Sequence, residues 1–355
     1  MRRGKPVNLA LQGGGAHGAF TWGVLDRLLE DGRLEIAAVS GTSAGAMNAV
    51  VLAQGIHEDG HAGGRAALER FWRRVSTAAR TSPIRRSPLD VLTGTWNLDR
   101  NPAYIMSDLM SRVASPYDLN PLGLNPLRDL LADTVDFEKV RACDRMALHV
   151  SATDVETGRV KVFHREELTL DMVMASACLP TLYHAVEVDG RHYWDGGYMG
   201  NPVIFPFYDS SPTDDVIIVQ INPIIRPGVP RSAREIANRI NEISFNGSLL
   251  KELRAIDFVH RLLENGHLPE GSYRYVRVHM IAAETELLRL GASSKLNAEW
   301  RFLRHLFRIG RRAADAWLAE HLDAVGLCGS VDLRMMFDGV SSPRSCPPAA
   351  ARDVA

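Results

Sequence analysis

The chain has 355 residues, of which 46% are hydrophobic, and its 41 basic and 42 acidic side chains leave a formal net charge of −1. This length and composition suffice for one large buried core, and they exclude an intrinsically disordered class for the body of the chain. The balanced charge excludes bulk attraction to nucleic acid or to an anionic membrane, and no apolar run reaches the roughly 18 residues that indicate a membrane span.

The first predicted element is an apolar strand over residues 9–11 that leads into three consecutive glycines, Gly13, Gly14 and Gly15. A helix-like run begins near Gly18. Glycines allow backbone N–H groups to approach an anion closely, and the N-terminus of the following helix adds unpaired donors. We therefore interpret the three glycines as the oxyanion hole of an acyl-transfer site, with Gly18 in a supporting role.

The same loop also matches the pattern G-x-G-x-x-G through Gly13, Gly15 and Gly18, so a dinucleotide-binding protein is an alternative. In a Rossmann unit, an acidic residue follows the next strand and binds the ribose. Here the next strand ends in Ser40 and leads into a turn that carries a serine. This position favours the oxyanion hole over the cofactor site.

The second strand and the helix after it enclose a candidate nucleophile. Residues 36–40 form an apolar run, residues 44–53 form a helix-like run of small and apolar residues, and between them lies Gly41-Thr-Ser43-Ala-Gly45. This is the G-x-S-x-G pattern of a nucleophile elbow, in which the serine sits on a sharp turn with positive φ and the glycines leave room for the backbone to cross. Ser43 is the predicted nucleophile, and Gly41 and Gly45 support the turn.

The composition and hydrophobic pattern of the chain change after the elbow. Residues 57–64 are polar and glycine-rich and predict a loop, and residues 65–79 return to helical spacing. Five prolines interrupt the apolar segment 81–125, which we interpret as a helical cap or lid-like insertion over the α/β core. Two short helices are predicted over 126–132 and 137–142.

A strand over residues 146–153, a turn at Asp154 and a strand over 160–164 follow. Asp154 is a rival for the catalytic base, but no glycines follow it, and a structural role is preferred. The next predicted helix spans residues 170–177 and carries Ser176, which is expected to bond to backbone near the site.

A carboxylate that suits the serine comes much later in the chain. Residues 187–194 resemble two short strands around an Asp-Gly turn, and Asp195, Gly196 and Gly197 come directly after them. A serine nucleophile needs a base, and the glycines after this carboxylate let it approach closely. Asp195 is therefore the predicted base, supported by Gly196 and Gly197.

The remaining elements alternate strands with helices, as in an α/β sandwich with a mostly parallel central sheet. A strand is predicted over residues 215–221, a long amphipathic helix over 233–264, a strand over 273–281 and an arginine-rich helix over 300–317 with one apolar stripe. We expect this stripe to pack in the core of the protein. The alternative is that it forms a contact face for an oligomer or for a membrane surface.

Four of these motifs, in this order, resemble the patatin-like phospholipases, a family of lipid acyl hydrolases. The motifs are the glycine loop at residues 13–18, the elbow at 41–45, Ala-Ser-Ala-Cys-Leu-Pro at 175–180 and Asp-Gly-Gly at 195–197. The resemblance covers about residues 5 to 225. One departure is His17, where the family usually has Arg or Lys.

The resemblance implies a three-layer α/β/α sandwich in one domain over residues 5–325, with the 81–125 cap and a helical C-terminal extension at 230–325 packed on it. The last segment, 341–355, is rich in Pro, Ser and Ala and predicts a disordered tail. The implied activity is hydrolysis of phospholipid or lysophospholipid esters by a Ser43/Asp195 dyad.

No metal or other cofactor is expected, because the four cysteines lack metal-ligand spacing. The expected location is cytoplasmic, with transient contact to a membrane surface and an oligomer through the C-terminal helices as possibilities. Two rival functions stay open: a Ser-Asp-His triad, using one of the later histidines His260, His267 and His279, and a non-catalytic lipid-binding or regulatory module.

Overall fold

A computed structural model of the chain describes residues 4–269 and 271–339, and the tail expected at 341–355 lies outside them. Eight strands form one sheet in the order β5-β6-β3-β2-β1-β7-β8, and β4 pairs with β3 off this path. The strands are β1 (Lys5–Leu11), β2 (Leu34–Thr42), β3 (Ala147–Asp154), β4 (Val160–His164), β5 (Val186–Val188), β6 (Arg191–Asp195), β7 (Asp215–Val219) and β8 (Arg277–Ile281).

The five strands β3, β2, β1, β7 and β8 are mutually parallel, whereas β4, β5 and β6 form antiparallel pairs beyond β3. Parallel strands need crossover connections, and helices supply them. The helices are α1 (Gly18–Asp31), α2 (Ala44–Ala78), α3 (Pro88–Leu92), α4 (Pro102–Met110), α5 (Pro116–Leu119), α6 (Pro126–Thr134), α7 (Phe137–Ala142), α8 (Leu170–Ser176), α9 (Phe207–Ser210), α10 (Ala233–Glu264), α11 (Glu284–Leu287), α12 (Trp300–His321) and α13 (Leu333–Asp338).

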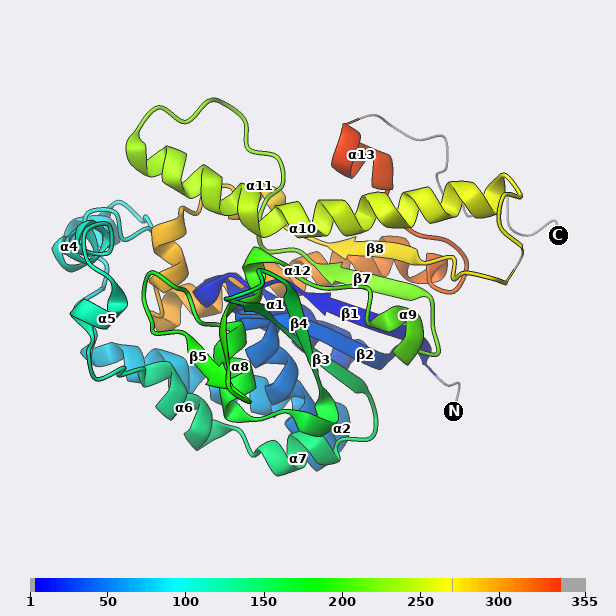
Figure 1. Cartoon of the computed structure of the whole chain (residues 1–355), viewed down its shortest axis with the longest axis horizontal. Coiled ribbons are helices and arrows are strands. Elements are labelled where there is room, and N and C mark those ends of the chain that lie inside the picture. The colour runs from blue at the N-terminus through cyan, green and yellow to red at the C-terminus, as the bar shows by residue number, and fades with distance from the viewer. Residues whose placement is uncertain (1–3, 270, 340–355) are drawn as a thin grey trace.

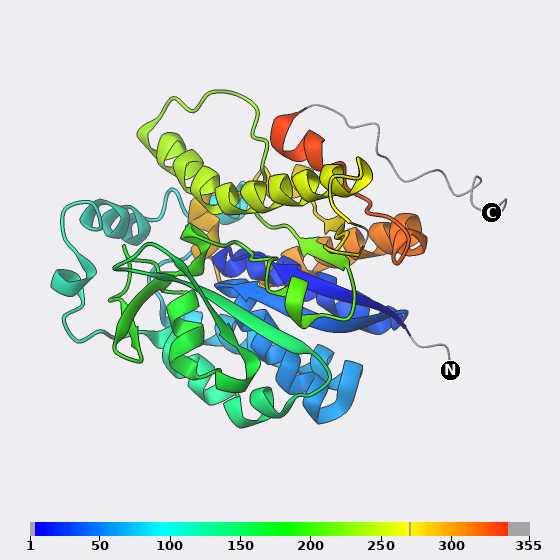
Figure 2. The ribbon, with the colours of Figure 1, turned by 45° about the vertical axis from the view of Figure 1, so that its right-hand side comes forward.

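Alternate residues of β1 face two different hydrophobic cores. Leu9 and Leu11 pack with α1, α2 and α12, whereas Ala10 packs with α9, α10 and α13 on the opposite face. Helix α10 therefore lies on one side of the blue strands β1 and β2, and α2 lies on the other (Figures 1 and 2). The predicted three-layer α/β/α sandwich with a mostly parallel central sheet is confirmed.

The loop predicted over residues 57–64 is wrong in extent. Helix α2 is interrupted only at Asp59 and Gly60, where φ/ψ of −151°/39° and 54°/−140° reverse the chain. The two helical halves then touch through glycines: a Cβ on Gly63 would lie 2.1 Å from the carbonyl oxygen of Gly55. These glycines permit close packing between helices, a role that the sequence pattern does not distinguish from that of a loop.

Helix α12 packs along α1, so the apolar stripe predicted over residues 300–317 belongs to the core. The ring centroids of Trp22 and Phe307 lie 4.2 Å apart. The two helices approach so closely that a Cβ on Gly310 would meet the backbone oxygen of Phe20 at 2.1 Å. On the polar side, Arg311 forms ion pairs with acidic residues of α1. This stripe is therefore covered within the chain.

The segment 230–325 adds a strand as well as helices. β8 extends the sheet beyond β7, with Asp215 opposite Arg277 and Val219 opposite Ile281. The segment therefore contributes a strand to the central sheet and side chains to the core on both faces. The expected description, a helical extension packed on the domain, leaves this strand out.

The insertion over residues 81–125 carries α3, α4 and α5, and the latter two helices project at the left end of the molecule (Figures 1 and 2). It is joined to the body by a buried side chain, an ion pair and an aromatic contact, among others. Leu98 is fully buried, Arg86 binds Glu299 at 2.7 Å, and Tyr117 stacks on His184 with ring centroids 4.1 Å apart. Much of its remaining apolar surface is exposed.

Candidate active site

Ser43 occupies the sharp turn between β2 and α2. Its φ of 55° and ψ of −120° lie in a region that a non-glycine residue rarely adopts, at a cost of roughly 1–3 kcal/mol. The crossing backbone requires the flanking glycines: a Cβ on Gly41 would lie 2.6 Å from the backbone of Gly45, and a Cβ on Gly45 would lie 2.2 Å from the Leu11 carbonyl oxygen. The residue thus has the strained strand-to-helix geometry that the pentapeptide predicts.

Ser176 holds the backbone of this turn. The Ser43 amide donates a hydrogen bond to the Ser176 hydroxyl at 2.9 Å, and Ser176 is itself fully buried at the end of α8. The expected bond from Ser176 to backbone near the site is therefore confirmed. It brings the Ala-Ser-x-x-x-Pro segment into contact with the elbow across 133 residues of sequence.

The register of the sheet places Asp195 level with Ser43. Thr42 pairs with Ser151 of β3, and the next residue of β3, Ala152, pairs with Asp195 of β6. Two strand spacings, about 10 Å in total, separate the two backbones. The Ser43 side chain interacts with the Asp195 carboxylate across β3 and lowers its pKa.

Asp195 is a buried carboxyl group. Burial raises its pKa to about 6, and the amide of Gly197, a hydrogen-bonding interaction with the Ser43 side chain and the charge of Lys295 oppose that rise. Oδ1 accepts a hydrogen bond from Gly197 N at 2.7 Å, whereas Oδ2 is buried without a hydrogen-bond partner of full geometry. The Ser43 side chain therefore lowers the pKa of the carboxyl group, although Oδ2 does not accept a hydrogen bond from it.

The backbone of Asp195 is fixed from both sides. Its amide donates to the Cys178 carbonyl at 2.7 Å, and its carbonyl accepts from the Thr153 hydroxyl at 2.8 Å. The adjacent glycines allow close packing, since a Cβ on Gly196 would lie 2.2 Å from Ser151 O and one on Gly197 2.2 Å from the Phe245 ring. Only glycine fits these two positions without displacing the neighbours.

The glycine loop lies against the elbow, because a Cβ on Gly13 would meet the Ser43 Cβ at 2.7 Å. The backbone amides of Gly13, Gly14 and Gly15 are the three predicted oxyanion donors, and they differ in whether another group already accepts their hydrogen bond. The Gly13 amide already donates to the side-chain oxygen of Asn201 at 2.6 Å. Within the described part of the chain, no acceptor binds the amides of Gly14 and Gly15. Gly15 has a φ of 57° that favours glycine.

A comparison with protein-family models identifies the family of this chain. The family model of the patatin-like phospholipases matches residues 9–214, which is more than half of the chain and includes the glycine loop, the elbow and the Asp-Gly-Gly motif. The chain belongs to the patatin-like phospholipase family. At the level of the family this makes it a lipid hydrolase.

Two solved structures similar to this patatin-like chain are bacterial proteins. VipD from Legionella pneumophila is 15% identical, with a TM-score of 0.34, and the match covers 86% of this chain and 67% of VipD. ExoU from Pseudomonas aeruginosa, solved in complex with SpcU, is 15% identical, with a TM-score of 0.29, and the match covers 88% of this chain and 53% of ExoU. The patatin-like chain thus spans about half the length of that ExoU structure. No curated protein matches the sequence.

The rival residues of the patatin-like site have other roles. Asp154 accepts hydrogen bonds from the amide and the hydroxyl of Thr157 at 2.8 and 2.9 Å, which closes the turn after β3. His279 is fully buried and bonds to Asp215 at 3.1 Å, at the end of β7 remote from the glycine loop. His260 stacks on Tyr275. These contacts give no support to a triad that uses either histidine.

His17, the departure from the family pattern, is buried and neutral. Burial and the nearby charge of Lys295 lower its pKa to about 3. Its Nε2 lies 2.8 Å from the Ser294 hydroxyl, and that hydroxyl donates to the Gly291 carbonyl at 2.7 Å, so Nε2 carries the proton. Gly18 supports the loop by close contact, because a Cβ there would lie 2.8 Å from the Ala44 Cβ.

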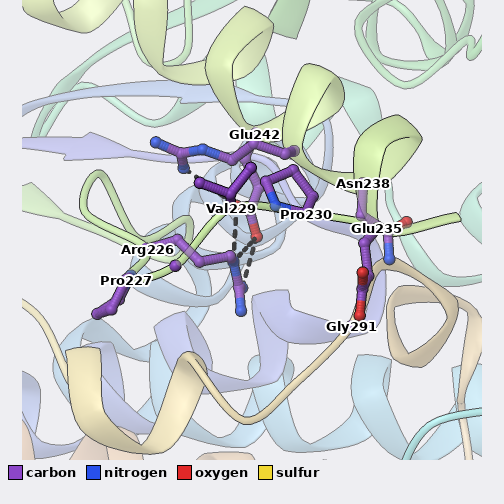
Figure 3. A pocket seen from close by; sticks show the side chains of 10 residues that line it. Arg226, Pro227, Val229, Pro230, Glu235, Asn238, Glu242 and Gly291 are labelled. Atoms are coloured by element: carbon purple, nitrogen blue, oxygen red, sulfur yellow. Dashed lines mark hydrogen bonds and ion pairs between the residues drawn. The ribbon is translucent and has the colours of Figure 1, made fainter. Parts of the chain in front are cut away.

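A pocket of about 280 Å³ lies beside this region, between α10 and the loop that precedes it, and its residues include Arg226, Val229, Asn238 and Glu242 (Figure 3). Glu242 bridges the guanidinium groups of Arg226 and Arg239. Neither member of the predicted dyad lines the pocket, so we do not assign it to the acyl chain.

In the described residues, no group of three or more His, Cys, Asp or Glu side chains is placed to bind a metal ion. None of the described helices combines the length and the apolar character that a membrane span requires.

Sequence reasoning missed three residues near the glycine loop, namely Asn201, Asn222 and Lys295. Asn222 donates to the Gly13 carbonyl at 2.8 Å and in turn accepts from the Lys295 ammonium group at 2.8 Å. None of the three belongs to a motif. They reach the loop only through the tertiary fold.

Proposed function

We propose that the chain hydrolyses carboxylic ester bonds of phospholipids or lysophospholipids through Ser43 and Asp195. The observation that carries the proposal is a strained serine at positive φ next to a buried carboxyl group with a raised pKa. A solvated carboxylate is a poor base for a hydroxyl, whereas a desolvated one is better matched to a proton transfer near neutral pH.

In the first step the Ser43 oxygen bonds to the ester carbonyl carbon while its proton passes to Asp195. The amides of Gly14 and Gly15 hold the negative charge on the carbonyl oxygen. The tetrahedral intermediate then expels the alcohol, which takes the proton from Asp195, and leaves an acyl group on Ser43.

In the second step water attacks the acyl-serine. Asp195 accepts a proton from that water, the acyl carbon–oxygen bond to Ser43 breaks, and Asp195 returns the proton to the serine oxygen as the fatty acid leaves. The Gly13 amide contributes to the oxyanion site only if Asn201 releases it, because that amide is already engaged.

The test is labelling by a serine-directed fluorophosphonate together with release of fatty acid from a panel of phospholipids and lysophospholipids. Ser43→Ala and Asp195→Asn are expected to abolish turnover, and Ser43→Ala to abolish labelling. Ser176→Ala retains the nucleophile and is expected to keep labelling. A wild-type chain that neither labels nor releases fatty acid would favour the non-catalytic lipid-binding or regulatory module.

We also propose that the insertion over residues 81–125 rests on the membrane surface that holds the substrate. Its large apolar side chains are exposed in an unusual concentration: Leu89, Val91, Leu92, Ile105, Met106, Leu109, Val113, Tyr117, Leu119, Leu122 and Leu124. Exposed apolar patches of this kind are typical of interaction sites, and a lipid hydrolase must reach ester bonds in an aggregate.

Co-sedimentation with neutral phosphatidylcholine vesicles tests this proposal. Leu92→Glu combined with Leu122→Glu places two charges at positions that are 83% and 80% exposed, and is expected to weaken vesicle binding without changing the unfolding midpoint. The matched control is Val229→Glu, at a side chain that is 82% exposed in the loop before α10 and outside the insertion. Equal binding by the wild type and the double variant would refute the membrane role.

A further inference from the structure

Lys295 is a partly buried lysine beside the glycine loop. It belongs to the short 3-10 helix Ala292–Leu296, outside the residues that the family model matches. In the described residues no carboxylate lies within 4.0 Å of its ammonium group. Burial lowers its pKa to about 8. A lysine whose pKa is lowered beside a candidate site is a candidate functional residue.

The ammonium group is tied to the glycine loop by a chain of two hydrogen bonds. It donates to Asn222 Oδ1 at 2.8 Å, and the Asn222 amide group donates to the Gly13 carbonyl at 2.8 Å. The backbone of Lys295 touches the same loop, since a Cβ on Gly15 would lie 2.5 Å from the Lys295 carbonyl oxygen. The 3-10 helix therefore supports the loop directly.

The same ammonium group faces the predicted base. It lies 5.6 Å from the centroid of the Phe245 ring, and that ring packs against Gly197, whose amide binds Asp195. The charge of Lys295 lowers the pKa of Asp195. The group is thus hydrogen-bonded towards the glycine loop and acts electrostatically on the carboxylate.

Four charged or titratable groups face Lys295. Glu242 on α10 and Asp195 favour its protonated form, and Arg226 opposes it. His17, on the loop itself, is neutral because burial and Lys295 lower its pKa. The loop's own side chain therefore supplies no positive charge.

We propose that Lys295 is a positioning residue of the Ser43–Asp195 site, whose ammonium group supplies the positive charge that keeps Asp195 ionised and favours an oxyanion at the glycine loop. This inference rests on the proposed function. It assigns to a residue near the C-terminal end of the fold the role that a cation at position 17 would otherwise fill.

The variants Lys295→Met and Lys295→Arg test the charge separately from the length of the side chain. The full chain is assayed on a soluble short-chain p-nitrophenyl ester and by its rate of fluorophosphonate labelling from about pH 5 to about pH 10. Lys251→Met, at an exposed lysine on α10, is the matched control. Thermal unfolding of all variants identifies any loss of fold.

We expect Lys295→Met to lower kcat roughly tenfold to a hundredfold with a smaller effect on KM. The acid limb of kcat/KM moves to higher pH, because removal of the cation raises the pKa of Asp195. Wild-type activity falls again as the pH rises through about 8, where Lys295 loses its charge. Lys295→Arg retains most activity and shifts that alkaline limb upward, since a guanidinium stays charged.

Two results would overturn the inference: a Lys295→Met variant with the wild-type kcat and pH profile, or a Lys295→Arg variant that loses as much as Lys295→Met. If the wild type neither turns over ester nor labels at Ser43, the proposed function itself fails. If the wild type does both and Lys295→Met labels with an unchanged pH profile, only the role of Lys295 fails.

Discussion

Asp195→Asn is expected to stabilise the fold while it abolishes activity. Burial raises the pKa of this carboxyl from 3.8 to about 6. At roughly 1.4 kcal/mol for each unit of pKa, keeping the group ionised in the folded state costs about 3 kcal/mol near neutral pH. Asparagine carries no charge, and its side-chain oxygen still accepts the hydrogen bond from Gly197.

The difference in stability between Asp195→Asn and the wild type depends on pH, because the pKa of Asp195 is higher in the folded state than in the unfolded state. Above pH 6 the carboxyl is ionised in both states, so the wild type bears the full cost and the variant is more stable. Between about 6 and 3.8 the folded state holds a proton that the unfolded state has lost, and the advantage of the variant shrinks as the pH falls. Below 3.8 both states are protonated and the advantage disappears.

Urea unfolding of the wild type and Asp195→Asn at a series of pH values measures this difference. Asp154→Asn is the control of opposite sign, because hydrogen bonds from Thr157 lower the pKa of Asp154 and its ionised form therefore stabilises the fold. The reasoning is refuted if Asp195→Asn is no more stable than the wild type above pH 6, or if its advantage does not change with pH.

Three further predictions concern packing, the elbow and a second buried acid. Gly310→Ala in α12 should lower the free energy of unfolding by roughly 1–3 kcal/mol, because its Cβ would meet the backbone of α1 at 2.1 Å. Ser176→Ala removes the acceptor of the Ser43 amide, and kcat should fall roughly threefold to tenfold with little change in KM. Glu252→Gln should raise the free energy of unfolding most above pH 7, because burial raises the pKa of Glu252 from 4.5 to about 7, and this gain should shrink as the pH falls from about 7 to 4.5.

Urea unfolding and steady-state kinetics check these three predictions. For the packing prediction, Gly247→Ala in α10 is the control, because a Cβ there meets nothing within 4 Å and alanine should stabilise the helix by roughly 0.5–1 kcal/mol. Equal effects at the two glycines would contradict it. Unchanged kcat in Ser176→Ala would mean that the elbow keeps its geometry unaided, and a pH-independent gain in Glu252→Gln would point to packing instead of charge.

The parts of the site that lie in short motifs were predictable from sequence. The strained turn at Ser43 follows from two glycines and a change of hydrophobic period, which are local properties. The pairing of strands that sets Asp195 level with the elbow is not local, and only the order of the motifs and the family likeness indicated it. The engagement of the Gly13 amide by Asn201 had no sequence signal at all.

Two other features could not be predicted from the sequence, for physical reasons. The glycines of residues 57–64 predicted a loop, but Gly63 serves contact between helices by packing against Gly55, and composition does not separate these uses. Lys295 occurs in no pattern, because only the fold brings it into contact with Gly15, 280 residues earlier in the chain.

Helix α12 packs against α1, and strand β8 pairs with β7. These contacts matter for the expression of fragments of this protein. The matched region ends at residue 214, one position before β7 begins. A fragment cut there would leave the β1 edge unpaired and the tryptophan-lined surface of α1 open to water, so it should aggregate instead of yielding a minimal enzyme. The smallest piece worth cloning therefore extends through α12.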